Sequence, residues 1–165
     1  MKERMEEYSI EEIPIERAME FFTLQMKYLI EDKIITDEED IEYFEGEEYR
    51  GIIKVHMVRE IDRHHMVYIK RDEVRIGAAQ FNTYHSQDGE CFILDYWIFP
   101  PFRGNGTGHK AFEALKAYTE KDGAKYYRIN AEKDDSIRFW KSLGFIEEGI
   151  DEYGVPLFVK KDTNI

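Results

Sequence analysis

The feature that most restricts the fold of this chain is a short glycine-containing loop between an apolar run and a helical pattern. The apolar run at 90–99 reads ECFILDYWIF, and the chain then passes through PPF and RGNGTG into GHKAFEALKAY. A helix that starts directly after a strand presents backbone N–H groups without intrahelical partners, together with the positive end of the helix dipole. Gly104, Gly106 and Gly108 carry no Cβ atom that would hold an anion away from these amides. The sequence therefore predicts a site for an anion such as a diphosphate, with a simple strand-to-helix turn as the alternative.

Two familiar phosphate-binding patterns do not fit this loop. The dinucleotide pattern G-x-G-x-x-G requires a glycine at position 109, where the chain has His109. The Walker pattern requires Gly-Lys-Ser or Gly-Lys-Thr after a longer spacer. The pattern that remains is Arg-x-x-Gly-x-Gly, in which Arg103 adds a positive charge beside the amides.

Length and composition indicate one globular domain at 1–165. Of the 165 residues, 42% are hydrophobic and 15% aromatic, which is enough to form a core. Cys91 is the single cysteine and allows no internal disulfide. Neither a signal peptide nor an apolar span of membrane length is visible, so we expect a cytoplasmic protein. The net charge of -12 argues against nucleic acid as a partner and favours a cationic small molecule.

Hydrophobic periodicity predicts an α/β (α+β) chain in which a mixed, mostly antiparallel central sheet has helices on both faces. Three successive strand-like runs, at 65–71, 74–84 and 90–99, predict an antiparallel meander. The other expected strands lie at 7–13, 124–131, 145–150 and 156–161. The expected helices lie at 15–33, from Thr36 or Asp37 to 61 with breaks at Gly46 and Gly51, at 108–123, and at 134–144 after an Asp cap. The apolar face of the first helix comprises Ala18, Phe21, Phe22, Met26, Leu29 and Ile30.

The loop and one further motif resemble the GNAT superfamily of N-acetyltransferases. RGNGTG is similar to the acetyl-coenzyme-A loop of that family, and IFPPF stands before it where many members carry a branched residue and a proline. SIRFWKSLGF resembles the second landmark of the family, in which an aromatic residue lies four positions before Gly-Phe. The resemblance spans nearly the whole chain and implies the GNAT fold. It also implies that acetyl-coenzyme A is the co-substrate, that a primary amine attacks the acetyl group directly in a ternary complex, and that no metal is required.

The resemblance further implies which residues contact coenzyme A. The amides at the start of the helix would bind the pyrophosphate, and the exposed backbone of the preceding strand would hold the pantetheine arm. The Ile98 amide would polarise the thioester carbonyl. The implied cofactor residues are Trp97, Ile98, Phe99, Arg103, Gly104, Asn105, Gly106, Thr107, Gly108 and Phe139.

The chain departs from the family pattern at two positions. Trp140 stands where members often have a tyrosine that protonates the departing thiolate, and Lys133 stands where an asparagine commonly meets the pantetheine arm. An indole N–H cannot serve as that acid, and a core aromatic is the structural alternative for Trp140. Tyr96, Tyr84 and Tyr153 are candidates to replace the tyrosine, and water is another.

Asp95 lies three residues before Ile98 and resembles the acidic position found there in polyamine-type members of the family. The resemblance makes it the first candidate for the base that removes a proton from the ammonium group, directly or through a water. Strict alternation along the strand would place Asp95 on the face opposite Ile98, with Glu90 and Tyr96 on the Ile98 side, and a bulge would reverse this arrangement. Glu90 is the second candidate for the base and water the third. The catalytic candidates are therefore Asp95, Glu90 and Tyr96.

Two other charged or titratable groups invite interpretation. His64 and His65 are adjacent at a strand start, where side chains point to opposite faces, so we expect surface residues rather than a metal pair. The segment 31–48 contains ten Asp or Glu residues and one basic residue, Lys33. In a GNAT fold this segment would wall the acceptor side of the groove and attract a cation, or it is an ordinary solvated helix face.

Two function classes remain open. The first is an N-acetyltransferase that transfers an acetyl group from acetyl-coenzyme A to a primary amine of a small, cationic acceptor. The second is a non-catalytic coenzyme-A-binding or regulatory module on the same fold, for which Trp140 is the main argument. The expected partner is a small-molecule amine, with homodimer formation left open, and we expect neither nucleic acid nor a membrane as a partner.

Overall fold

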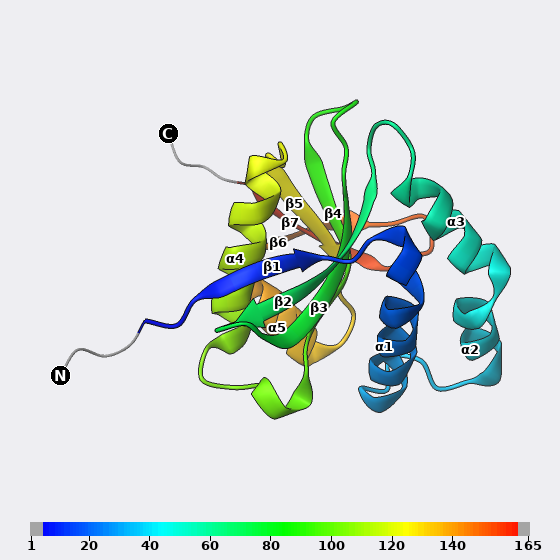
Figure 1. Ribbon diagram of the computed structural model, residues 1–165, viewed down its shortest axis with the longest axis horizontal. Helices are drawn as coiled ribbons and strands as arrows, with labels where there is room; N and C mark the ends of the chain where they lie inside the picture. Colours follow the sequence, from blue (N-terminus) through cyan, green and yellow to red (C-terminus); the bar gives the residue numbers. More distant parts are fainter. Residues whose placement is uncertain (1–4, 162–165) are drawn as a thin grey trace.

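The computed structural model describes residues 5–161 as a seven-stranded sheet flanked by helices (Figure 1). Along the sheet the strands lie in the order β1-β2-β3-β4-β5-β7-β6. The strands are β1 (Tyr8–Glu12), β2 (His64–Arg71), β3 (Val74–Thr83), β4 (Glu90–Ile98), β5 (Tyr126–Asn130), β6 (Ile146–Ile150) and β7 (Pro156–Lys161). The helices are α1 (Ala18–Glu31), α2 (Glu38–Glu45), α3 (Glu47–Met57), α4 (Thr107–Lys121) and α5 (Asp134–Ser142), with 3-10 turns at Ile15–Arg17 and Pro100–Phe102.

Antiparallel pairing dominates the sheet. β1 to β4 form an antiparallel meander, β5 joins β4 in parallel, and β7 pairs antiparallel with both β5 and β6. One face is covered by α4 and α5, where Phe112 and Trp140 pack with the buried side chains of the sheet. The other face is covered by α1, α2 and α3 (Figure 1). There Phe21 and Phe22 pack with Trp97. The predicted fold, a mixed and mostly antiparallel sheet with helices on both faces, is confirmed.

Most element boundaries fall within a few residues of the predicted ones. Asp37 caps α2 with its side chain, and Gly46 separates α2 from α3. The expected break at Gly51 is wrong, because Gly51 lies inside α3. The expected Asp cap of α5 is also wrong, because the N-cap residue is Lys133 and no side chain caps this helix. Ile30 is 46% exposed and does not belong to the apolar face of α1.

A bulge in β4 decides which side chains face which helices. Leu94 is the extra residue between the pairs that Ile93 and Asp95 form with β3. Ile93 before the bulge and Ile98 after it both pack on the α4 side, whereas Asp95 hydrogen-bonds to α1. The expectation that a bulge would bring Asp95 to the Ile98 face is wrong, because the bulge precedes Asp95. The residues before the bulge, Glu90 among them, change face relative to strict alternation.

β4 and β5 pair over a short stretch only. Their pairing runs from Glu90↔Tyr126 to Ile93↔Ile129. Beyond Ile93, no strand within residues 5–161 pairs with this edge of β4. The edge of β4 from Asp95 to Ile98 is therefore unpaired on the side of β5.

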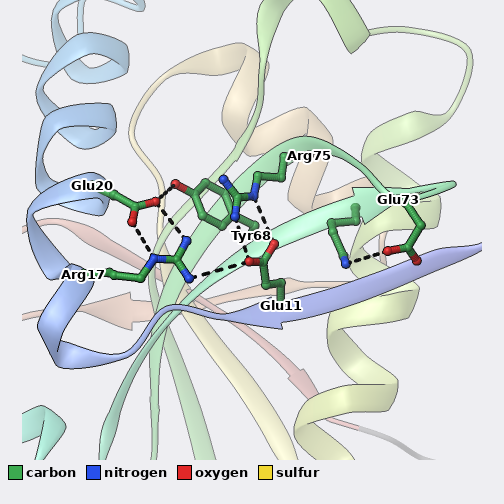
Figure 2. A network of polar contacts seen from close by, with 7 residues as sticks. Glu11, Arg17, Glu20, Tyr68, Glu73 and Arg75 are labelled. Carbon is green, nitrogen blue, oxygen red and sulfur yellow. Dashed lines mark hydrogen bonds and ion pairs between the residues drawn. The ribbon is translucent and has the colours of Figure 1, made fainter.

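A polar network fixes the start of α1 on the sheet (Figure 2). Arg17 contacts Glu20 in the first turn of α1 and Glu11 on β1, and Glu20 also accepts a hydrogen bond from the Tyr68 hydroxyl of β2. Arg75 of β3 pairs with Glu11 and lies over the Tyr68 ring, 4.0 Å from its centroid. The hydrogen bonds from Arg17 and Tyr68 lower the pKa of Glu20 to about 2. The network links α1 to three strands and so sets the position of this helix above the sheet.

The described residues 5–161 contain no candidate for a membrane-spanning helix and no candidate cluster of metal ligands. None of the helices there combines the length and the hydropathy that crossing a bilayer requires. Over the same part of the chain, no group of three or more His, Cys, Asp or Glu side chains is arranged to hold a metal ion.

Candidate active site

A cleft with a volume of about 830 Å³ opens where β4 and β5 diverge. It is lined by Leu29, Asp32 and Ile34 near the end of α1, by residues 93–98 of β4, by Arg103, Gly104 and 106–109 at the start of α4, and by residues within 129–140 of β5 and α5. The predicted site residues that line the cleft are Asp95, Tyr96, Trp97, Ile98, Arg103, Gly104, Gly106, Thr107, Gly108 and Phe139. Those that do not line it are Glu90, Phe99 and Asn105.

The glycine loop has a left-handed backbone at three successive residues. Gly104, Asn105 and Gly106 have φ angles of 98°, 55° and 74°, and Gly106 is the N-cap of α4. A Cβ atom at Gly104 or Gly106 would meet no atom within 4 Å, so the space beside both residues is open. Within residues 5–161, the amides of Asn105, Gly106 and Gly108 form no backbone hydrogen bond, whereas the Thr107 amide donates to the Gly104 carbonyl at 3.1 Å. The loop therefore offers free amides at the start of α4, and Thr107 is not one of them.

The presence of a glycine at position 108 has a different explanation from that of Gly104 and Gly106. A Cβ atom at this position would lie 2.7 Å from the ring of Phe139 on α5. Phe139 in turn stacks on Tyr96, with ring centroids 5.9 Å apart. Close packing of α4 against α5 accounts for this glycine, rather than access for an anion.

The edge of β4 that faces the cleft exposes a backbone N–H at Ile98. The Phe99 amide donates to the Ile76 carbonyl of β3 at 2.8 Å. Because amides alternate in direction along a strand, the Ile98 N–H points away from β3, toward the unpaired edge. The Ile98 carbonyl accepts a hydrogen bond from Arg103 Nε at 2.6 Å. Ile98 thus keeps a donor for a guest in the cleft, whereas the Phe99 amide is used within the sheet and the Phe99 ring stacks on Tyr28.

The end of α1 is tied to both sides of the cleft. The Arg103 guanidinium forms a two-point pair with Asp32, with Nη1–Oδ1 and Nη2–Oδ2 distances of 3.2 Å and 2.8 Å. Lys133 Nζ donates to the backbone carbonyls of Asp32 and Lys33, each at 2.7 Å. The positive charge expected at Arg103 is therefore balanced by Asp32, and Lys133 binds the carbonyl end of α1.

Asp95 is held by two glutamine side chains. Gln80 Nε2 of β3 and Gln25 Nε2 of α1 donate to the same oxygen, Asp95 Oδ2, the latter at 3.0 Å. Both amides also donate to the Tyr49 hydroxyl of α3, at 3.2 Å and 2.8 Å. Asp95 Oδ1 forms no hydrogen bond within the described part of the chain. Burial raises the pKa of Asp95 to about 6, although the hydrogen bonds from Gln80 and Gln25 act in the opposite direction. One oxygen is thus fixed and the other is available to accept a proton near neutral pH.

The sequence from residue 20 to residue 145 matches the model of one protein family, described as the acetyltransferase (GNAT) family. The chain belongs to this family. The resemblance inferred from the glycine loop and the second landmark is confirmed. No curated protein matches the chain in sequence.

Solved structures share the GNAT fold at low sequence identity. One is the PaiA N-acetyltransferase of Thermoplasma acidophilum in complex with coenzyme A, with 15% identity, a TM-score of 0.68, and coverage of 94% of this chain and 99% of that one. Another is the aminoglycoside N-acetyltransferase AAC(6')-Iy in complex with coenzyme A, with 15% identity, a TM-score of 0.60, and coverage of 93% and 97%. A third, from Salmonella typhimurium, modifies the N-terminal serine of a 50S ribosomal subunit protein, with 13% identity, a TM-score of 0.62, and coverage of 93% and 94%. Two of these names describe different acceptors, an aminoglycoside and the N-terminus of a protein, so the shared fold leaves the acceptor open.

In this GNAT-family chain, a buried tryptophan occupies the position expected for a tyrosine. Trp140 is 6% exposed and packs edge to face against Tyr96, Phe112, Phe139 and Phe145, with ring centroids between 5.0 Å and 5.8 Å apart. The same side chain lines the cleft. Trp140 is therefore both a core aromatic and part of the cleft wall.

Of the three tyrosines considered as acids, Tyr96 is the one that lines the cleft. Its hydroxyl donates to the Gly108 carbonyl at 2.6 Å. Burial raises the pKa of Tyr96 well above its ordinary value, so the hydroxyl stays protonated at neutral pH. Tyr84 lies elsewhere, and Tyr153 is 83% exposed in the turn between β6 and β7.

Two groups suggested by the sequence lie away from the cleft. Glu90 is at the far end of β4, where it pairs with Arg128 of β5. Burial raises the pKa of Glu90, with Arg128 acting in the opposite direction. In the acidic segment, Asp32 lines the cleft, whereas the acidic residues at the start of α2 are exposed and do not line it.

Sequence reasoning missed the polar residues around Asp95. Gln25, Gln80 and His64 are buried, and Tyr49 is partly buried beside them. The expectation that His64 is a surface residue is wrong, since its side chain is 2% exposed. One signal was available, because Gln25 interrupts the apolar face of α1 and Gln80 interrupts the apolar run of β3.

Proposed function

We propose that this chain is an acetyl-coenzyme-A-dependent N-acetyltransferase whose acceptor is a primary amine of a small, cationic molecule, and that residues 1–165 act as one catalytic domain. The observation that carries the proposal is Asp95, a partly buried carboxylate in the same cleft as the free amides of the glycine loop. An ammonium group must lose a proton before its nitrogen can attack a carbonyl. A proton acceptor in the same cleft as a phosphate-binding loop is therefore the arrangement that acylation of an amine requires.

The loop and the edge of β4 fit acetyl-coenzyme A. The free amides of Gly106 and Gly108 at the start of α4 would bind the pyrophosphate, and the open space at Gly104 and Gly106 leaves room for its oxygens. The pantetheine arm would lie along the unpaired edge of β4, where the Ile98 N–H is the available donor. The bound co-substrate supplies the acetyl group as a thioester.

Asp95 would take the proton from the ammonium group of the acceptor through Oδ1, directly or through a water. The neutral amine nitrogen then bonds to the acetyl carbon while the C–S bond breaks. The Ile98 N–H donates to the acetyl oxygen, on which negative charge develops. The acetylated nitrogen then loses its remaining extra proton to water. The sulfur leaves as a thiolate and takes a proton from water or from the Tyr96 hydroxyl, which water then reprotonates. The products are the N-acetylated amine and coenzyme A, and no covalent enzyme intermediate is needed.

Charge supports a cationic acceptor. Asp95 has no basic hydrogen-bond partner within residues 5–161, so an ammonium group would supply the opposite charge that the ionised carboxylate lacks. The chain as a whole carries a net charge of -12, which attracts cations from a distance. The acceptor is therefore proposed to be an amine that is protonated at neutral pH.

A second candidate function is a coenzyme-A-binding module without catalysis. One observation favours it, because Trp140 stands where the family pattern has the acid.

Thiol release from acetyl-coenzyme A, measured with a panel of primary amines, distinguishes the two functions. The panel should hold linear diamines, an aminoglycoside, neutral amines and a peptide with a free N-terminus, and mass spectrometry should locate the acetyl group. We expect turnover with cationic amines and much less with neutral ones. Calorimetric binding of acetyl-coenzyme A without turnover over the whole panel would favour the binding module, and no binding would contradict the loop assignment.

A further inference from the structure

His64 of β2 lies directly behind the side chains that hold Asp95. Its Nε2 atom is 2.7 Å from Gln80 Oε1, and its Nδ1 atom is 2.8 Å from Asn82 Oδ1. Both His64 and Gln80 are buried, with exposures of 2% and 0%, so bulk water cannot replace either hydrogen bond. His64 contacts Asp95 only through Gln80 and does not line the cleft.

The partners of Gln80 favour one orientation of its amide group. A side-chain amide has a donor end and an acceptor end, and the hydrogen-bond partners decide which end points where. The Nε2 end of Gln80 faces Asp95 Oδ2 and the Tyr49 hydroxyl, and the Oε1 end faces His64. If the amide were reversed, its oxygen would face the Asp95 carboxylate, and two acceptors would meet without a proton between them. A protonated His64 Nε2 prevents this reversal, because it donates to Oε1.

We propose that His64 is a positioning residue for Asp95: by donating from Nε2 to Gln80 Oε1, it keeps the Gln80 amide nitrogen on Asp95 Oδ2 and leaves Oδ1 free for the acceptor. This inference rests on the proposed function, in which Asp95 is the base. It adds a residue that never touches the substrate but sets how readily Asp95 binds a proton.

Gln80 and Asn82 compete to decide which tautomer of His64 the site favours. Asn82 Nδ2 donates to the Asp62 backbone carbonyl at 3.2 Å, so that Oδ1 faces His64 Nδ1. Only a doubly protonated His64 ring could donate to both Gln80 and Asn82. Burial lowers the pKa of His64 to about 4, although its two hydrogen bonds act in the opposite direction, so the ring is neutral at neutral pH. A neutral ring has one N–H. With the proton on Nε2, the Asn82 amide must be reversed to donate to Nδ1, and it loses its hydrogen bond to the neutral Asp62 carbonyl. With the proton on Nδ1, the Gln80 amide must be reversed, and it loses its hydrogen bond to the Asp95 carboxylate, which is the larger loss. The proton therefore belongs on Nε2.

The other titratable groups near this path do not replace His64. His65 on β2 and His56 on α3 act on His64 by charge alone. Tyr49 on α3 accepts hydrogen bonds from Gln25 and Gln80, and burial raises the pKa of its hydroxyl to about 12. None of these three groups has a hydrogen bond to Gln80 Oε1 in the described residues.

The test is a carbon-13 NMR titration of the Asp95 carboxyl in the unliganded protein, with the signal assigned through Asp95→Asn. In His64→Leu, Gln80 loses its partner and its orientation, so the titration midpoint of Asp95 should rise by roughly one pH unit, the effect of losing a hydrogen bond to a charged group. His64→Gln keeps a donor and should return the midpoint to within a few tenths of a unit of the wild type. The matched control is His65→Leu, because His65 faces the opposite side of β2 and pairs with Glu12; it should leave the midpoint unchanged.

An unchanged midpoint in folded His64→Leu, or an equal shift in His65→Leu, would overturn the proposal. If His64→Leu does not fold, nitrogen-15 spectra of the wild type decide: a proton on Nε2 is expected, and a neutral ring with its proton on Nδ1 overturns the proposal. The titration uses neither acetyl-coenzyme A nor an acceptor. If the midpoint shifts as expected but Asp95→Asn keeps the full acetylation rate, the proposed base fails and the positioning stands. If Asp95→Asn abolishes the rate but no shift occurs, only the positioning fails.

Discussion

Burial of Asp95 raises the pKa of its carboxyl group and lowers the stability of the fold at neutral pH. Its pKa in the folded chain is about 6, compared with an ordinary value of 3.8, and burial is the main cause. Because the folded-state pKa is the higher one, folding favours the protonated carboxyl. This contribution to stability is fully present below about pH 3.8 and is lost as the pH rises through 6. At neutral pH the fold therefore holds an ionised carboxylate at the expense of its own stability.

Asp95→Asn should stabilise the protein at pH 7.5 but not at pH 4. Asparagine keeps the shape and an acceptor oxygen for the two glutamines, and it removes a charge that is unfavourable only above the folded-state pKa. We expect the difference in free energy of unfolding, variant minus wild type, to increase by about 1–3 kcal/mol between these pH values. Urea unfolding at both pH values measures this difference.

The control for that experiment is Asp88→Asn. The Tyr126 hydroxyl hydrogen-bonds to Asp88 and lowers its pKa, so ionised Asp88 stabilises the fold at neutral pH. The variant should therefore show a change of opposite sign between the two pH values. Equal stability differences for Asp95→Asn at both pH values would contradict the raised pKa of Asp95.

At the residue scale, the sequence predicted Asp95 but not its environment. Asp95 and Tyr96 follow from their place on the strand before the glycine loop. The partners of Asp95 come from α1, β2, β3 and α3, and only tertiary packing brings them together. The bulge at Leu94 is likewise a property of strand pairing, which no local pattern specifies. The position of Asp95 before the glycine loop and the resemblance to the GNAT family therefore pointed to this candidate base, whereas the residues around it could not be read from local sequence.

At the scale of elements, the loop and helix α4 were predictable because their signals are local. The left-handed backbone at Gly104 and Gly106 explains the glycines of RGNGTG directly. Gly108 looked equivalent in the sequence, and its contact with Phe139 depends on how α5 packs against α4. Likewise, the sequence placed Arg103 beside the loop but could not reveal Asp32 as its partner, because these residues lie on different elements.

Gly106→Val should weaken the binding of acetyl-coenzyme A. The new side chain would occupy the open space beside the loop amides and strain a backbone with φ of 74°. We expect a loss of more than about 2 kcal/mol in binding free energy, the effect of displacing charge-assisted hydrogen bonds. Titration calorimetry measures the change.

Gly149→Val is the matched control for backbone strain. Gly149 has φ of 76°, has open space around it, and lies on β6, outside the cleft. Both variants should lose similar folding stability, but Gly149→Val should bind acetyl-coenzyme A like the wild type. Unchanged affinity in folded Gly106→Val, or an equal loss in both variants, would refute the loop assignment.

At the scale of the whole molecule, charge is distributed so that cations are drawn to the protein. The net charge is -12, and the segment 31–48 holds ten of the acidic residues. Asp37, Glu38, Glu39 and Asp40 are exposed at the start of α2, where they also complement the helix dipole. Their sequence pattern suggested a steering role, and their position outside the cleft restricts that role to long range.

Neutralising these four residues to Asn or Gln should lower kcat/KM for cationic amines at low salt. Exposed charges act over roughly 8–10 Å near physiological ionic strength, so the effect should shrink as salt is added. The affinity for acetyl-coenzyme A should change little. A control with the same change in net charge neutralises Glu113, Glu120, Glu147 and Glu152 on α4 and the β6–β7 region. If both sets of changes have the same effect, the α2 residues have no special steering role.

The most direct test of the account is the pH dependence of kcat/KM for acetylation of a cationic amine by the wild type and by Asp95→Asn. If Asp95 is the base, kcat/KM of the wild type should rise with pH through a midpoint near 6, the pKa that burial gives this carboxyl. Asp95→Asn should lose that rise and fall by roughly 10²–10⁴-fold, the usual contribution of a general base. The same rate and the same rise in Asp95→Asn, with the variant folded and binding acetyl-coenzyme A normally, would contradict the account.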